Sequence, residues 1–124
     1  MTAKNTSFSQ LNASAVCASI EQYIAGKKRL LLLCHVNPDG DTIGSAFALQ
    51  RIYTLLGGYA RCACTSDAPG YLQFLLQEQD SLLYTPNMEK QFDAIWTIDV
   101  ASPTQLGRLF PLSDQVSLSI DHHE

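Results

Sequence analysis

The chain has 124 residues, of which 46% are apolar and 16% are charged, and its formal net charge is −4. This length and composition are typical of one globular domain and exclude a disordered tail. The negative charge argues against tight binding to a long phosphate backbone, although bound cations can still hold a small anionic substrate.

The first half of the chain alternates between helical and extended patterns. Residues 1 to 11 are polar and predict a flexible terminus. A helix is expected from a cap at Asn12 or Ser14 to Gly26, and the apolar run over residues 30 to 36 predicts a central strand. A second helix follows, and it ends at a glycine pair. Its expected apolar face is Ile43, Phe47, Ile52, Leu55 and Leu56.

The second half of the chain predicts three more strands. Residues 59 to 65 form the first of them, and a short helix is expected over residues 71 to 77. Residues 94 to 98 predict the next strand, after which Pro103 can open a short helix. The last strand is expected over residues 116 to 120. Strands that alternate with helices indicate an α/β protein, with a parallel sheet and helices on both faces.

Polar side chains follow three of these strands directly. His35, Asp99 and Asp121 each come after a strand. In such sheets, ligands bind beyond the carboxyl ends of the strands, so the order 2-1-3-4 would bring the three segments to one edge. All three histidines of the chain, His35, His122 and His123, lie in these segments. Imidazole and carboxylate together suit Mn²⁺, or Mg²⁺ where carboxylates dominate, and the number of groups favours two ions.

These segments could also belong to other known motifs or serve only as turns and caps. An EF-hand fails because Thr42 and Ala48 stand where glycine and glutamate are needed, and a P-loop or a zinc finger lacks its lysine or paired cysteines. Taken alone, NPDGD also indicates a turn and a helix cap at Asp41 or Thr42. Taken alone, an aspartate at the end of a strand, such as Asp99, is more often a turn residue than a ligand. The three segments together favour a site.

Three motifs resemble those of the DHH phosphoesterase superfamily. They are H-x-N-P-D-G-D at residues 35 to 41, the strand-ending Asp99, and D-H-H at residues 121 to 123. The segments TIGSAFAL and TIDVASPTQLGR are similar as well. The first motif looks most like the branch of oligoribonucleases that also dephosphorylate 3′-phosphoadenosine 5′-phosphate. Cyclic-dinucleotide phosphodiesterases and family II pyrophosphatases share much of the pattern.

The resemblance implies roles for the matched residues. His35 and Asp39 would bind the first ion, Asp41 and His122 the second, and Asp99 would bridge the two. His123 would face the phosphate as a catalytic group. Asp121 would lie beside it and orient rather than ligate. The ions would be Mn²⁺, with Mg²⁺ or Co²⁺ as alternatives, and the fold would be Rossmann-like.

The implied activity is two-metal hydrolysis of short oligoribonucleotides or of 3′-phosphoadenosine 5′-phosphate. The alternatives are a cyclic-dinucleotide phosphodiesterase, a pyrophosphatase, or a non-catalytic module that binds metal or another chain. Residues 12 to 124 would be the amino-terminal part of a DHH domain. The family's later aspartate and its carboxyl-terminal substrate-binding domain are not matched, so the chain alone is expected to be inactive.

The termini, apolar runs and cysteines of the sequence bear on location and partners. No signal peptide is visible, and the longest apolar run is shorter than the roughly 20 residues of a membrane helix. Four cysteines without a C-x-x-C pair are all expected to be buried, in a reducing compartment. We therefore expect a cytoplasmic protein that binds a nucleotide phosphate, not a membrane or long nucleic acid. The two oligomeric states that the sequence leaves open are a monomer and a homodimer.

Overall fold

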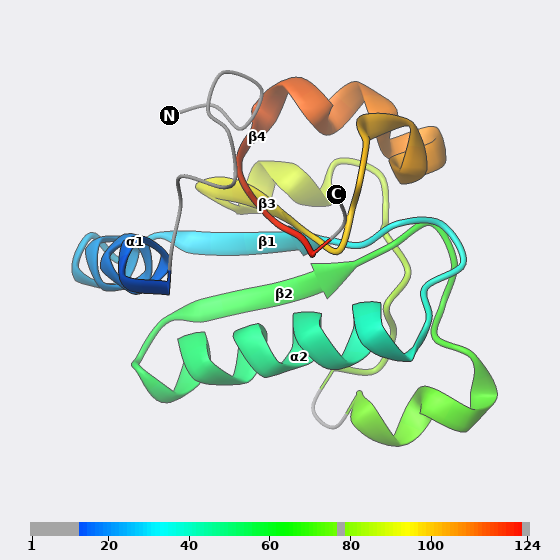
Figure 1. The fold of residues 1–124 in the computed structure, drawn as a ribbon, viewed down its shortest axis with the longest axis horizontal. Coiled ribbons are helices and arrows are strands. Elements are labelled where there is room, and N and C mark those ends of the chain that lie inside the picture. The colour runs from blue at the N-terminus through cyan, green and yellow to red at the C-terminus, as the bar shows by residue number, and fades with distance from the viewer. Residues whose placement is uncertain (1–12, 77–78, 123–124) are drawn as a thin grey trace.

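The computed structural model describes residues 13–76 and 79–122. Its centre is a four-stranded parallel sheet in the order β2-β1-β3-β4, which confirms the predicted α/β fold class and strand order (Figure 1). The expected flexible terminus, residues 1 to 11, lies outside the described residues. The strands are β1 (Arg29–Leu33), β2 (Tyr59–Ala63), β3 (Ala94–Ile98) and β4 (Val116–Ile120).

Helices cover both faces of the sheet. One face packs against α1 (Ala13–Ala25), α2 (Gly40–Leu55) and the 3₁₀ helix η3 (Gly70–Leu75). The other face packs against two more 3₁₀ helices, η4 (Met88–Gln91) and η5 (Pro103–Gln115). In the described part of the chain, no helix is both long enough and apolar enough to cross a membrane.

The strand β1 is the centre of the core. Leu30 and Leu32 point to the side of α1 and α2, while Leu31 and Leu33 point to the side of η5, and all four are fully buried. A strand that is buried on both faces must be apolar throughout, which is why the continuous leucine run predicted a central strand correctly. A central strand of this kind fixes where the chain emerges at the carboxyl edge of the sheet.

The apolar face that the sequence predicted for α2 is partly wrong. Ile52, Leu55 and Leu56 are 48, 71 and 53% exposed. The buried stripe instead consists of Thr42, Ile43, Ala46, Leu49 and Tyr53. Two members of this stripe carry hydroxyl groups, so a count of apolar residues alone selects the wrong helical phase.

Several predicted boundaries also differ from the structure. β1 ends at Leu33 rather than at residue 36, and β2 ends at Ala63 rather than at residue 65. Beyond β1 the chain leaves the sheet, because the Val36 amide donates to the carbonyl of Gln105 and Asn37 has a φ of 52°. The helix opened by Pro103 extends to Gln115 as a 3₁₀ helix broken at one glycine.

One expectation about the cysteines is wrong. Cys17 is exposed on α1, whereas Cys34, Cys62 and Cys64 are buried free thiols. On α1, Ile20 is buried, whereas Cys17, one turn earlier, is exposed. The general tendency of cysteine to be buried therefore fails at this position.

Candidate metal centre

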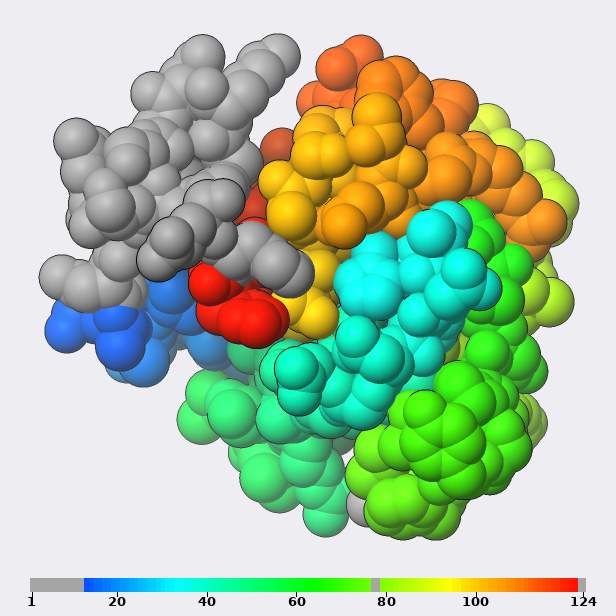
Figure 2. Space-filling view, turned by 45° about the vertical axis from the view of Figure 1, so that its right-hand side comes forward, coloured from blue at the N-terminus to red at the C-terminus, as the bar shows by residue number. Residues whose placement is uncertain are grey.

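The polar residues that follow the strands meet at the carboxyl edge of the sheet. His35 follows β1, Asp99 follows β3, and Asp121 and His122 follow β4. The Asp99 amide donates to the carbonyl of Ile120 over 2.8 Å, which ties the ends of β3 and β4 together. Figure 2 shows the cyan segment after β1, the yellow segment after β3 and the red end of β4 on one face of the molecule.

The first group of potential ligands joins β1, β3 and α2. His35, Asp39 and Asp99 each offer one ligand atom, and these atoms lie within 4.8 Å of one another. His35 Nε2 lies 3.7 Å from Asp99 Oδ2. His35 is partly buried and Asp99 is buried, whereas Asp39 is exposed at the start of the helix.

The second group shares Asp99 with the first. Asp99, Asp121 and His122 also offer ligand atoms within 4.8 Å of one another. His122 Nε2 lies 2.8 Å from Asp99 Oδ1. Asp41 is in neither group, but it lines the same open hollow as these three residues. The sequence expected Asp121 to orient rather than ligate, and its place among the potential ligands leaves that role a prediction.

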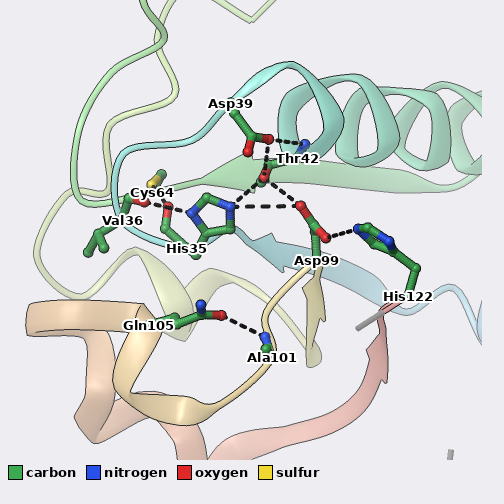
Figure 3. Close-up of polar contacts among 9 residues, drawn as sticks. All are labelled: His35, Val36, Asp39, Thr42, Cys64, Asp99, Ala101, Gln105 and His122. Carbon is green, nitrogen blue, oxygen red and sulfur yellow. Dashed lines mark hydrogen bonds and ion pairs between the residues drawn. The ribbon is translucent and has the colours of Figure 1, made fainter. Parts of the chain in front are cut away.

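Asp99 connects the two groups with opposite oxygens of one carboxylate. Oδ2 accepts a hydrogen bond from the Thr42 hydroxyl at 2.8 Å and faces His35, while Oδ1 faces His122 (Figure 3). Asp99 is only 6% exposed, and its backbone has a φ of 61°. A non-glycine residue in the left-handed region is uncommon and costs conformational free energy, so surrounding contacts must hold it there.

Asp39 is held by the first turn of α2. Its Oδ1 caps the helix by accepting from the backbone amide and the hydroxyl of Thr42, each over 2.9 Å. The hydrogen bond from the amide, and next that from the hydroxyl, hold the pKa of Asp39 below its ordinary value of 3.8.

Two features of the site have no clear signal in the sequence. Thr42 is fully buried at the centre of the first group, whereas the sequence suggested only a helix cap at this position. The loop after β1 is braced by η5 through the bond from Val36 to Gln105, a contact between residues far apart in the chain. The spacing from Asp39 to Thr42 matches a helix cap and its partner, which is the one local signal for Thr42.

The donor set fits a divalent cation. Imidazole nitrogens and carboxylate oxygens converge at a partly open edge, and a buried carboxylate is stabilised by a nearby positive charge. The predicted catalytic residue His123 lies outside the described residues. Fold and side chains together define an α/β protein with a candidate metal centre at the carboxyl edge of its sheet.

Comparisons with known proteins agree with the motifs. The bifunctional oligoribonuclease and PAP phosphatase NrnA of Thermus thermophilus is 33% identical over 96 residues, which cover 76% of this chain and 28% of that protein. A crystal structure of an exopolyphosphatase-related protein from Bacteroides fragilis shares the fold, with a TM-score of 0.68 and 22% identity over 86% of this chain and 35% of that chain. No protein-family model matches the chain.

The comparisons support assignment of the chain to the DHH phosphoesterase superfamily, through similarity to the amino-terminal part of its members. It spans between a quarter and two fifths of the length of the two proteins named above.

Proposed function

We propose that this chain carries the metal-binding part of a phosphoesterase that hydrolyses short oligoribonucleotides, 3′-phosphoadenosine 5′-phosphate, or both. Two divalent ions, Mn²⁺ by this proposal, would be held by His35, Asp39, Asp41, Asp99 and His122. The NrnA relative supports this choice of substrates, because its name gives the same pair of activities.

One observation carries the proposal: a single buried carboxylate, Asp99, belongs to both groups of potential ligands. Its two oxygens face different histidines, His35 and His122, which suits a ligand shared between two ions. Bound divalent ions would make a nearby water more acidic and neutralise charge on the phosphoryl oxygens.

The chain's own residues contribute rigidity and charge. The strand ends fix His35 and Asp99, and the cap bonds of α2 fix Asp39 as an ionised carboxylate at neutral pH. Such fixed ligands avoid reorganisation when charge develops on a substrate. His123 would face the phosphate, as its place in the D-H-H motif implies.

The first test removes the shared ligand. Asp99→Asn should abolish Mn²⁺-dependent hydrolysis by the complete gene product and should weaken Mn²⁺ binding about 100-fold or more, since loss of one bridging charge affects both ions. Asp121→Asn should retain more activity than Asp99→Asn. Binding is measured by isothermal titration calorimetry, and Asp114→Asn, at an exposed carboxylate on η5, is the control.

Equal losses in the Asp99 and Asp121 variants would contradict the shared role. Unchanged Mn²⁺ binding in Asp99→Asn would contradict the metal centre itself. Circular dichroism must first show that each variant is folded before either result is interpreted.

The second test separates the substrate classes. The complete gene product is given a short oligoribonucleotide, 3′-phosphoadenosine 5′-phosphate, cyclic di-adenylate and pyrophosphate, each with Mn²⁺. Preference for either of the first two supports the proposal, and preference for one of the others supports a phosphodiesterase or a pyrophosphatase. Mn²⁺ binding without hydrolysis of any of the four would indicate a non-catalytic metal-binding module.

A further inference from the structure

Thr42 occupies the centre of the first group of potential ligands. Its side chain is fully buried in the first turn of α2. The hydroxyl oxygen lies 2.6 Å from His35 Nε2, 2.9 Å from Asp39 Oδ1 and 2.8 Å from Asp99 Oδ2 (Figure 3). One hydroxyl therefore touches all three side chains that would hold the first ion.

More hydrogen-bond acceptors surround this hydroxyl than it has hydrogens to donate. His35 Nδ1 lies 2.6 Å from the Val36 carbonyl, which can only accept, so Nδ1 carries a hydrogen. In a neutral imidazole, Nε2 is then an acceptor. The two carboxylates accept as well, whereas a threonine hydroxyl has one hydrogen to donate. Three acceptors thus surround a single proton.

This imbalance has two consequences. The hydroxyl keeps three electron-rich atoms at hydrogen-bond distance from one point, where they would otherwise repel one another. The same arrangement leaves the cluster short of positive charge, which a cation at the open side would supply.

We propose that Thr42 is a positioning residue, which holds His35, Asp39 and Asp99 converged so that a divalent cation meets a preformed set of ligands. The proposal rests on the metal-binding role proposed above and assigns a determinant of cation affinity within it. Thr42 acts through the ligands, as the hydrogen-bonded partners of metal ligands generally do.

The backbone of Thr42 does not contribute to this role. Its amide donates to Asp39 Oδ1 over 2.9 Å and caps α2 whatever the side chain is. Thr42→Val therefore removes the hydroxyl while it keeps the helix cap and the side-chain shape. Thr42→Ser keeps the hydroxyl and loses only the methyl group.

The test is the affinity of the chain for Mn²⁺, measured by calorimetry on the wild type, Thr42→Val, Thr42→Ser and a control. Thr54→Val is the control, because Thr54 lies on the same helix and donates only to the Gln50 carbonyl, on the exposed side. Thr42→Val should weaken Mn²⁺ binding by about 10- to 100-fold, the usual effect of removing a partner of a metal ligand. Thr42→Ser and Thr54→Val should stay within a few-fold of the wild type.

A general packing defect predicts a different pattern. It would lower the melting temperature in EDTA for Thr42→Ser as well as for Thr42→Val. The two variants would then bind Mn²⁺ with similar affinity. Wild-type affinity in Thr42→Val, or equal weakening in both Thr42 variants, overturns the positioning role while the metal centre stands. Absence of Mn²⁺ binding in the wild type overturns both.

Discussion

At the scale of single residues, several side chains of the site serve two purposes. The sequence allowed NPDGD to be either a helix-capping turn or a set of ligands, and the structure shows that the cap is Asp39 rather than Asp41 or Thr42. A carboxylate has two oxygens, so capping with Oδ1 does not prevent Oδ2 from meeting a cation. The local patterns for a cap and for a ligand loop therefore coincide instead of competing.

Gly107 is a residue whose importance follows from its backbone. Its φ and ψ of 59° and −126° are unfavourable for any residue with a side chain, and an added Cβ would lie 2.5 Å from Val36 Cγ1. Gly107→Ala should lower the free energy of unfolding by about 2 kcal/mol or more, because it combines backbone strain with a clash against the loop after β1.

Gly44→Ala is the matched control for this prediction. Gly44 lies inside α2, and a Cβ there would meet nothing within 4 Å, so the change should stabilise the helix by up to about 1 kcal/mol. Urea denaturation followed by circular dichroism measures both effects. A Gly107→Ala protein as stable as the wild type would contradict the packing of η5 on the loop.

At the scale of elements, the sequence predicted what depends on local pattern. Residues 94 to 98 and 116 to 120 form strands at the expected positions, because short β-branched and apolar runs between turns are local signals. The 3₁₀ character of η3 and η5, and the early end of β1, were not predicted. The early end of β1 depends on a contact with a distant segment, the bond between the Val36 amide and the Gln105 carbonyl of η5, which no local pattern encodes.

Asp67 links two elements and should make their stability depend on pH. Its carboxylate accepts from the amides of Ala68 and Leu82 and from the hydroxyl of Ser81, each over 2.8 Å, and so ties the end of β2 to the segment that follows η3. Burial raises the pKa of Asp67, but these three hydrogen bonds outweigh it and hold the pKa below 3.8.

A carboxyl with a lowered pKa stabilises the folded state above its ordinary value of 3.8, and this contribution is lost as the pH falls through the lower folded value. Asp67→Asn should therefore cost about 1 kcal/mol at pH 7, the usual net contribution of a hydrogen bond, and should flatten the loss of stability as the pH falls below 3.8. Urea titrations at several pH values test this, with Asp114→Asn as the control. Parallel curves for Asp67→Asn and the wild type would contradict it.

At the scale of the whole molecule, the parallel sheet explains why so much of the site was predictable. Parallel strands present their carboxyl ends at one edge, so residues that follow β1, β3 and β4 must meet there once the order of the strands is right. Hence His35, Asp99, Asp121 and His122 come together from segments far apart in the chain. Thr42 was missed because its hydroxyl matters only after that convergence.

The four cysteines report on how the whole molecule opens. Cys17 is exposed, while Cys34, Cys62 and Cys64 are at most 1% exposed, and burial raises the pKa of each of these three thiols. Since the thiolate is the reactive form, the buried thiols should react only when the sheet opens. A thiol reagent such as Ellman's should label one cysteine of the native chain rapidly and all four in denaturant.

Metal should slow the labelling of the buried thiols, because their reactivity measures the stability of the folded state. A cation that binds only the folded chain stabilises it by mass action, so saturating Mn²⁺ should slow the labelling of Cys34, Cys62 and Cys64 about 10-fold or more. Cys64 contacts the site directly, since its thiol donates to the His35 carbonyl over 2.8 Å. Cys17→Ser should remove the rapid phase and leave the slow phases intact.

Two variants test whether this protection comes from the candidate metal centre. In Asp99→Asn, Mn²⁺ should no longer slow the labelling of the buried thiols, whereas in Asp114→Asn it should. Slowing of equal size in both variants would show that the cation binds elsewhere on the molecule.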